Sequence, residues 1–165
     1  MGWNETFFAA RVPPPARGKT VLIVEDDPQL RELYKTTLTM AGFVVVAVAD
    51  GLDALRRIDA GEPLPSAVVL DMELPRLHGR DVQRELAAHV NTRQIPIVVV
   101  SGTDTRGLNP NDFACVLRKP IEPEQLVKAI DDCVRGVGPR NQWAARVKHF
   151  VSRKMRRRAT DEQDD

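Results

Sequence analysis

The chain has 165 residues but only two cysteines, and none of its apolar runs is long enough to cross a bilayer. Cys115 and Cys133 match no metal-ligand spacing, and two cysteines cannot form a disulfide framework. The N-terminal residues lack the basic start and the long apolar core of a secretion signal. These absences exclude a disulfide-rich secreted scaffold and an integral membrane protein, so we expect a cytoplasmic chain with reduced thiols.

Charge is nearly balanced over the whole chain, with 24 basic and 23 acidic residues, but it is unevenly distributed. Residues 19–138 hold 14 basic and 18 acidic side chains, whereas residues 139–158 hold eight basic and no acidic ones. The central part of the chain is therefore mildly acidic. The basic character belongs to a C-terminal appendage.

Strand and helix signals alternate from Lys19 onward. Four short apolar runs, rich in β-branched residues and without polar alternation, predict strands buried on both faces of a parallel sheet. These runs are Val21–Val24, Val68–Leu70, Ile97–Val100 and Val116–Leu117, and another strand is expected at Phe43–Val48. With the intervening helices they make five β/α units, which predict an α/β fold with right-handed crossovers.

The helix signals lie between the expected strands. Asp27 before Pro28 predicts a helix N-cap, and the apolar stripe of this first helix includes Leu33. A second helix is expected near residues 51–60, a third over 79–90 with Val90 in its buried stripe, and a last one from Glu122. Residues 102–112 are rich in turn formers, so at most one helical turn fits there.

A polar residue follows each of the four apolar runs. Glu25 and Asp26 follow the first run, and Asp71, Ser101 and Lys119 follow the other three. In an open α/β sheet the carboxyl ends of the strands converge on one crevice, where ligands bind. Three carboxylates, a hydroxyl and an ammonium gathered there suit a divalent cation and a phosphoryl group.

In these motifs the chain from about residue 19 to 137 resembles the receiver domain of two-component response regulators, the phosphoproteins of phosphorelay signal transduction. The matching elements are Val24-Glu25-Asp26-Asp27, Asp71 with Pro75 and Gly79, Ser101-Gly102, and Lys119-Pro120. The resemblance implies a doubly wound, flavodoxin-like sheet of five parallel strands in the order 2-1-3-4-5. It also implies a phosphoacceptor signalling protein rather than an enzyme.

The resemblance implies a role for each site residue. Asp71 would accept a phosphoryl group from a histidine kinase or a histidine phosphotransfer protein. Asp26 would bind Mg²⁺ directly, Glu25 would bind it through water, Asp71 would add a carboxylate oxygen, and Glu73 its backbone carbonyl. Mn²⁺ is the alternative ion. Lys119, next to a cis bond, would pair with the phosphoryl group.

Ser101 would donate its hydroxyl to a phosphoryl oxygen, whereas Asp27 is expected to cap a helix rather than to bind the metal. Glu73 and Thr103 are expected to influence hydrolysis of the phosphoryl group. The sequence calls for no function at Asp50 or Asp53 and places the three histidines at the surface.

The chain departs from the family pattern in two places. Val116 stands where the family often has an aromatic residue, and only Phe113 is near enough to substitute. Only 17 residues separate Ser101 from Lys119, so we expect a shortened or missing fourth helix and an altered output surface.

Two other functions compete with phosphoryl acceptance. One is a phosphohydrolase of the haloacid dehalogenase kind, but such enzymes have a second Asp where this chain has Glu73. The other is a dimerisation or interaction module that works without phosphorylation and keeps a vestigial site. The intact set of acidic residues argues against the vestigial site, and we expect a single-domain response regulator without an effector domain.

Outside the receiver part (19–138), residues 1–18 read as a flexible leader and 139–165 as a basic amphipathic helix with an acidic tail. The apolar stripe of this helix comprises Trp143, Val147, Phe150 and Val151. The stripe can dock on the receiver or on a second copy, giving a homodimer, or it can order only with a partner. Residues 146–158 can also bind anionic surfaces weakly. The segment is too short for a helix-turn-helix, so sequence-specific DNA binding is not expected.

Overall fold

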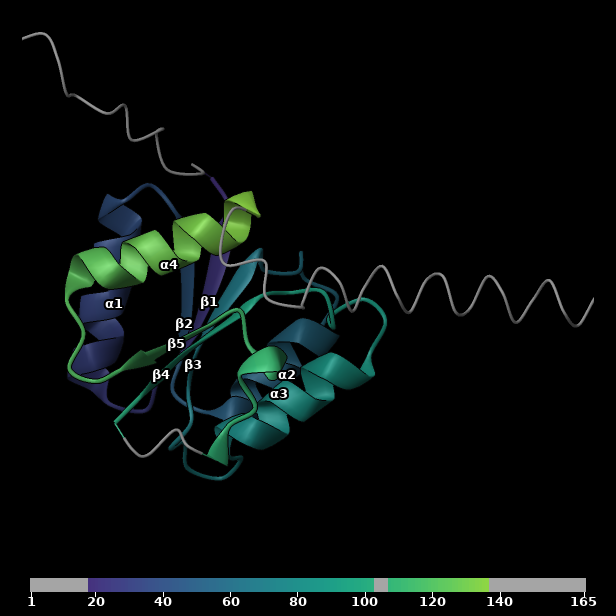
Figure 1. Ribbon diagram of the computed structural model, residues 1–165. Helices are drawn as coiled ribbons and strands as arrows, with labels where there is room; N and C mark the ends of the chain where they lie inside the picture. Colours follow the sequence, from purple (N-terminus) through teal and green to yellow (C-terminus); the bar gives the residue numbers. More distant parts are fainter. Residues whose placement is uncertain (1–17, 103–106, 137–165) are drawn as a thin grey trace, which may run out of the picture.

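The computed structural model describes residues 18–102 and 107–136 as an alternating series of strands and helices (Figure 1). The elements are β1 (Thr20–Val24), α1 (Pro28–Met40), β2 (Val44–Val48), α2 (Gly51–Asp59), β3 (Ala67–Asp71), α3 (Gly79–Ala88), β4 (Ile97–Ser101), the 3₁₀ turn η2 (Pro110–Asp112), β5 (Cys115–Arg118) and α4 (Pro123–Arg135). This order confirms the predicted β/α alternation.

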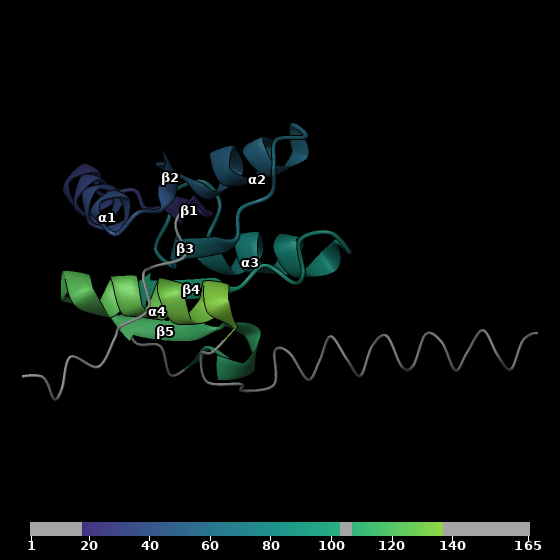
Figure 2. The same ribbon diagram turned by 90° about the horizontal axis from the view of Figure 1, so that it is seen from above.

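The five strands form one parallel sheet in the order β2-β1-β3-β4-β5, as the resemblance implied. Helices α1 and α4 cover one face of the sheet, and α2 and α3 cover the other (Figure 2). Two hydrophobic clusters fill these layers. One contains Tyr34, Leu38 and Ile130 beneath α1 and α4, and the other contains Val82 and Leu86 beneath α2 and α3.

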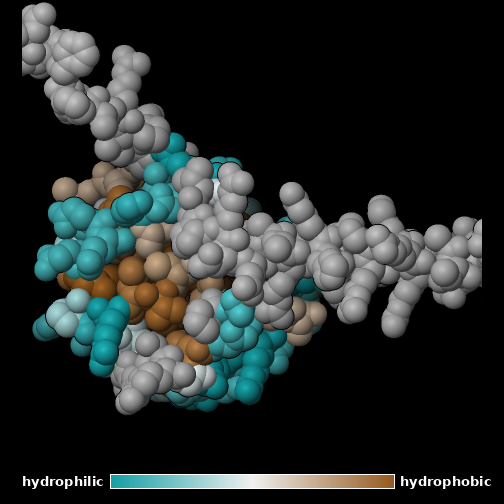
Figure 3. Space-filling view, in the orientation of Figure 1, coloured by the Kyte–Doolittle hydropathy of each residue, from teal (hydrophilic) through white to brown (hydrophobic). Residues whose placement is uncertain are grey.

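The central strands are the most deeply buried part of the sheet. Every residue of β3 and β4 is buried, as are the last four residues of β1, which confirms the prediction for these three runs. For β5 the prediction is wrong, because Val116 and Leu117 are only half-buried. A strand at the edge of a sheet has only one neighbour, and Figure 3 shows a hydrophobic area below α4 where β5 lies.

Helices α1 and α4 begin at the residues that the sequence predicted. Asp27 accepts hydrogen bonds from the amides of Gln29 and Leu30 at 2.8 and 3.0 Å, which satisfies two donors at the start of α1. Glu122 opens α4 in a capping box, and Gly136 ends this helix with a φ of 66°.

Two predicted core positions on helices are also wrong. Leu33 is 46% exposed, because Tyr34 and Leu38 form the buried face of α1 and Leu33 lies about 100° around the helix from Tyr34. Val90 is 65% exposed, because α3 ends at Ala88 and His89 has an extended backbone.

Between β4 and β5, the described residues contain only the η2 turn. This confirms the expected shortening of the helix that receivers usually have between these two strands, which is a different helix from the one labelled α4 here. Phe113 is buried after this turn and belongs to the same hydrophobic cluster as Leu86, with Val116 packed against it. Thr103, the leader through residue 17 and the C-terminal apolar stripe lie outside the described residues, so their predictions stay predictions. Within the described ranges, no helix has the length and apolarity needed to span a membrane.

Two glycines allow close packing beside the carboxyl end of β3. A methyl group on Gly79 would lie 2.4 Å from the carbonyl oxygen of Asp71, and one on Gly51 would lie 2.8 Å from that of Leu77. Gly102 is different, since the nearest atom to its added methyl is a Lys119 side-chain carbon at 3.9 Å.

We therefore expect Gly79→Ala and Gly51→Ala each to lower the free energy of unfolding by about 1–3 kcal/mol, because the backbone must move to make room. Gly102→Ala, the matched control, should change it by less than about 0.5 kcal/mol. Urea denaturation measures all three. Equal stabilities for the three variants would contradict the packing described.

Candidate functional site

The candidate site lies at the carboxyl ends of four strands. The register pairs Val24 with Leu70, Asp71 with Val100, and Ser101 with Arg118. Asp71 and Ser101 are the last residues of β3 and β4. Glu25 and Lys119 directly follow β1 and β5, so all four residues lie at the same end of the sheet. The structure thus brings together the polar residues that the sequence placed at strand ends.

Three carboxylates meet at this end of the sheet. Glu25, Asp26 and Asp71 each place one carboxylate oxygen within 4.8 Å of the others. Glu25 and Asp71 are buried, at 1% and 4% exposure, while Asp26 is exposed. Like charges this close repel one another, and an oxygen-rich cluster of this kind fits Mg²⁺, a hard cation that prefers carboxylate ligands and retained water.

Lys119 joins two of these carboxylates. Its Nζ lies 2.8 Å from Asp71 Oδ2 and 2.9 Å from Glu25 Oε2. The backbone amide of Lys119 donates to the carbonyl of Ser101 at 2.9 Å, and the Lys119–Pro120 peptide bond is cis. The lysine is thus held in place by both its main chain and its ammonium group.

The protonation of the site follows from its burial. Desolvation raises the pKa of Glu25 to about 7, and the nearby charge of Asp71 adds to this rise, although hydrogen bonds from Lys119 partly offset it. Burial opposes the charged form of Lys119, but its hydrogen bonds to Asp71 and Glu25 outweigh burial and raise the pKa of the ammonium. Lys119 is therefore cationic at neutral pH, whereas Glu25 is partly protonated there.

Backbone contacts hold the carboxylates further. The amide of Glu73 donates to Asp71 Oδ1 at 3.0 Å, and the amide of Asp27 donates to Glu25 Oε1 at 3.3 Å. Arg31 donates from Nη1 to the carbonyls of Glu25 and Asp26, at 2.9 and 3.0 Å. Sequence reasoning missed Arg31, whose only signal was its place one turn into the helix that follows the acidic pair.

The other residues singled out from the sequence have the following positions. Ser101 is buried at the end of β4, and Glu73 is exposed. The metal-binding role of the Glu73 carbonyl stays a prediction. Asp27 caps α1, and amide hydrogen bonds from Leu30 and Gln29 lower its pKa. His78 and His89 are exposed, as predicted, whereas His149 lies outside the described residues.

Asp50 has a role that the sequence reasoning did not assign. Its carboxylate accepts from the amide of Asp53 at 3.0 Å as the N-cap of α2, and it forms an ion pair with Arg76. Asp50 is only 3% exposed. The one signal was its place before Gly51, which predicts a cap but not a partner 26 residues away.

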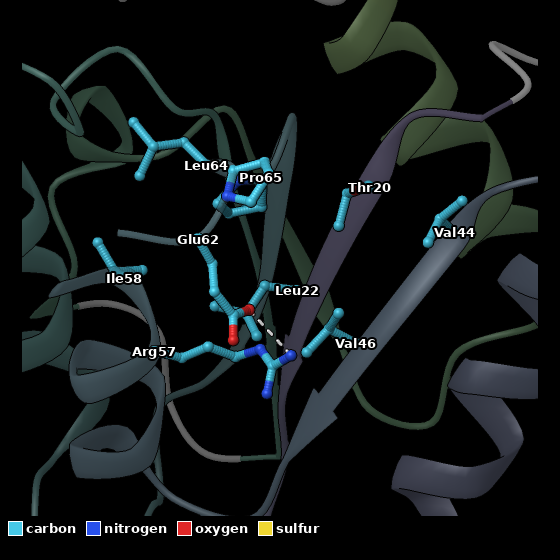
Figure 4. Close-up of a pocket in the computed structure, with 10 residues that line it drawn as sticks. Thr20, Leu22, Val44, Val46, Arg57, Ile58, Glu62, Leu64 and Pro65 are labelled. Carbon is cyan, nitrogen blue, oxygen red and sulfur yellow. Dashed lines mark ion pairs between the residues drawn. The ribbon is translucent and has the colours of Figure 1, made fainter. Parts of the chain in front are cut away.

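A separate cavity lies at the opposite, amino ends of β1 and β2 (Figure 4). It encloses about 180 Å³ between Leu22, Val46 and Leu64, and an ion pair between Arg57 and Glu62 lies beside it. None of the strand-end polar residues lines this cavity, so it is not part of the candidate site.

Comparison with known proteins agrees with this arrangement. Residues 21–131 match the family described as the response regulator receiver domain. The chain belongs to this family. Receivers are signalling domains of two-component systems that work with histidine kinases or phosphotransfer proteins, and they bind Mg²⁺ in an acidic site. Because the chain belongs to the receiver family, the alternative of a haloacid dehalogenase-like phosphohydrolase is dropped.

Two curated relatives illustrate the similarity. The chain is 34% identical over 123 residues to the Regulator of RpoS of Escherichia coli K12, covering 73% of this chain and 33% of the relative. It is 36% identical over 115 residues to the DNA-binding response regulator MtrA of Mycolicibacterium smegmatis, covering 67% and 48%. The chain thus spans a third to about half of the length of these relatives.

Two solved structures have the same fold. A putative response regulator from Chloroflexus aurantiacus has 28% identity and a TM-score of 0.66, over 72% of this chain and 99% of its own. The receiver domain of sensor histidine kinase PA1611 from Pseudomonas aeruginosa PAO1 has 27% identity and a TM-score of 0.61, over 72% and 98%. That domain has a magnesium ion coordinated in its active-site cleft.

The raised pKa of Glu25 predicts that Mg²⁺ binding depends on pH. The cation favours the ionised carboxylate, so binding should release a proton near pH 7, and the affinity should fall about tenfold from pH 8 to pH 6. Isothermal titration calorimetry in two buffers of different ionisation enthalpy measures both quantities. Glu25→Gln should remove most of the pH dependence. Equal affinities of the unaltered protein at pH 6 and pH 8 would contradict the assignment.

Proposed function

We propose that this chain accepts a phosphoryl group on Asp71 from a histidine kinase or a histidine phosphotransfer protein and signals through protein–protein contacts. The observation that carries the proposal is the position of the Lys119 ammonium, 2.8 Å from Asp71 within a cluster of three carboxylates. Family membership adds to the case, because receivers work with such kinases.

The transfer is a nucleophilic displacement at phosphorus. A carboxylate oxygen of Asp71 forms a new bond to phosphorus while the bond from phosphorus to the imidazole nitrogen of the donor breaks. The electron pair of the broken bond returns to the imidazole. The Glu73 amide on Asp71 Oδ1 and the Lys119 ammonium on Oδ2 hold the carboxylate in one orientation for this step.

The charge of the incoming group needs compensation. Glu25, Asp26, Asp71 and the backbone carbonyl of Glu73 would hold Mg²⁺, with Mn²⁺ as the alternative, and the bound cation supplies positive charge beside the phosphoryl oxygens. Lys119 provides a second positive charge from the carboxyl end of β5, and the hydroxyl of Ser101 donates to a phosphoryl oxygen. Lys119 exchanges its contact with Asp71 for one with the phosphoryl group.

The rest of the proposal concerns the location and the contacts of the protein. We place the protein in the cytoplasm, where histidine kinases present their phosphoryl groups. The apolar stripe of residues 143–151 is proposed as a homodimer contact, and residues 146–158 as a weak, nonspecific anion-binding segment. The short η2 turn between β4 and β5, in place of a full helix, favours an output surface other than that of typical receivers. A phosphorylation-independent module is not favoured, since the acidic cluster and Lys119 are intact.

Labelling with acetyl phosphate tests the proposal. We expect the protein to gain the mass of one phosphoryl group in the presence of Mg²⁺, and to lose that gain with EDTA or with Asp71→Asn. Lys119→Ala should slow labelling about 100-fold or more, because it removes a preorganised charge. Intact-mass spectrometry follows each reaction, and Lys128→Ala, which removes an exposed lysine of α4, is the matched control. Equal labelling of Asp71→Asn and the unaltered protein would refute the assignment.

A further inference from the structure

The loop between β3 and α3 contains a strained turn. Among the described residues, Arg76 is the only non-glycine residue with a positive φ, at 63°. The amide of Leu77 donates to the carbonyl of Pro75 at 2.7 Å, which closes a three-residue γ-turn around Arg76. Turns of this kind with a positive φ are rare and strained, and a side chain adds a steric cost. Such a conformation persists only where the surrounding structure holds it.

An ion pair to the neighbouring helix supplies this support. The Arg76 guanidinium pairs with the carboxylate of Asp50 and lies 3.7 Å from Asp53 Oδ2. The Asp50 side chain is only 5% exposed, and a buried carboxylate is stable only with a partner. Asp50 is fixed in turn as the N-cap of α2. The strained turn is therefore tied to the rigid start of a helix.

The loop has little room to move on its other side. Met72 and Leu74 are buried in the core, and the close contacts of Gly51 with Leu77 and of Gly79 with Asp71 leave no space for a methyl group. Within this loop the Glu73 amide contacts Asp71 Oδ1 at 3.0 Å. The γ-turn and the Glu73 amide that contacts Asp71 therefore belong to one tightly packed loop.

We propose that Arg76 is a positioning residue for the phosphorylation site. Its ion pair with Asp50 holds the β3–α3 loop so that the Glu73 amide orients the Asp71 carboxylate and the Glu73 carbonyl stays available to the cation. Arg76 itself contacts neither the metal ligands nor the phosphoryl group. The inference rests on the proposed function, because it concerns the cation site that this function uses.

Mg²⁺ affinity, measured by isothermal titration calorimetry on the full chain, tests the inference. Arg76→Ala and Asp50→Asn should each weaken Mg²⁺ binding about tenfold, the size of effect expected when a group behind a metal ligand is lost. Asn keeps the capping oxygen at position 50, so α2 retains its N-cap. Arg84→Ala is the matched control, since it removes an arginine whose ion pair with Asp81 lies within α3, and it should bind Mg²⁺ as the unaltered protein does.

Two further variants separate the ion pair from a general loss of structure. Arg76→Gly should weaken Mg²⁺ binding less than Arg76→Ala, because glycine adopts a positive φ without steric cost. The double variant Arg76→Ala with Asp50→Asn should lose no more affinity than either single variant, because both remove the same contact.

Amide hydrogen exchange in the absence of Mg²⁺ gives an independent readout. The Glu73 and Leu77 amides should exchange faster in Arg76→Ala than in Arg84→Ala, while amides of the central strands stay unchanged. A merely structural role for Arg76 would instead accelerate exchange throughout the chain.

Unchanged Mg²⁺ affinity in folded Arg76→Ala, or equal losses in Arg76→Ala and Arg84→Ala, would overturn the inference. If Arg76→Ala fails to fold, the Mg²⁺ affinities of Asp50→Asn and Arg76→Gly, each compared with that of Arg84→Ala, test the inference instead. Mg²⁺ binding by a protein whose Asp71 is never labelled would refute the proposed function but leave the inference standing. Absence of Mg²⁺ binding by the unaltered protein would refute both.

Discussion

The Lys119 ammonium is the group on which the rest of the site depends. Two buried carboxylates, Asp71 and Glu25, face each other across the ends of β3 and β1, and Lys119 from the end of β5 hydrogen-bonds to both. Removing one partner of a buried ion pair typically costs about 3–5 kcal/mol, because the other charge is left uncompensated. Lys119 therefore stabilises the apo site, and the same positive charge is then available to an incoming phosphoryl group.

The parallel sheet makes this arrangement possible. Strands β1, β3 and β4 are buried on both faces between two helical layers, so their ends are held rigidly. Functional groups carried on rigid strand ends are more accurately placed than groups on free loops. The loop between β3 and α3, which contributes Glu73, is tied down by its buried side chains and by the ion pair from Arg76 to Asp50. The ion pair thus holds a strained turn in the loop that carries Glu73.

Much of this architecture could be predicted from local sequence. Short apolar runs ended by polar residues predicted both the parallel strands and the meeting of Glu25, Asp71 and Lys119, since side chains at the ends of neighbouring strands must converge. Asp27 predicted the start of α1 in the same way. The exposure of Leu33 and Val90 could not be predicted, because it depends on how each helix is rotated against the sheet and on where the chain leaves it. The Arg76–Asp50 pair was missed because it depends on a loop backbone that no periodicity describes.

The central claim is that one cation-sized site joins Asp26, Asp71 and the lysine-paired Glu25. The most direct test is a crystal of the protein soaked in Mn²⁺ and measured at a wavelength where manganese scatters anomalously. The account predicts a single strong anomalous peak in contact with the carboxylates of Asp26 and Asp71, beside Glu25. No peak at these carboxylates, or a peak only elsewhere on the protein, would contradict it.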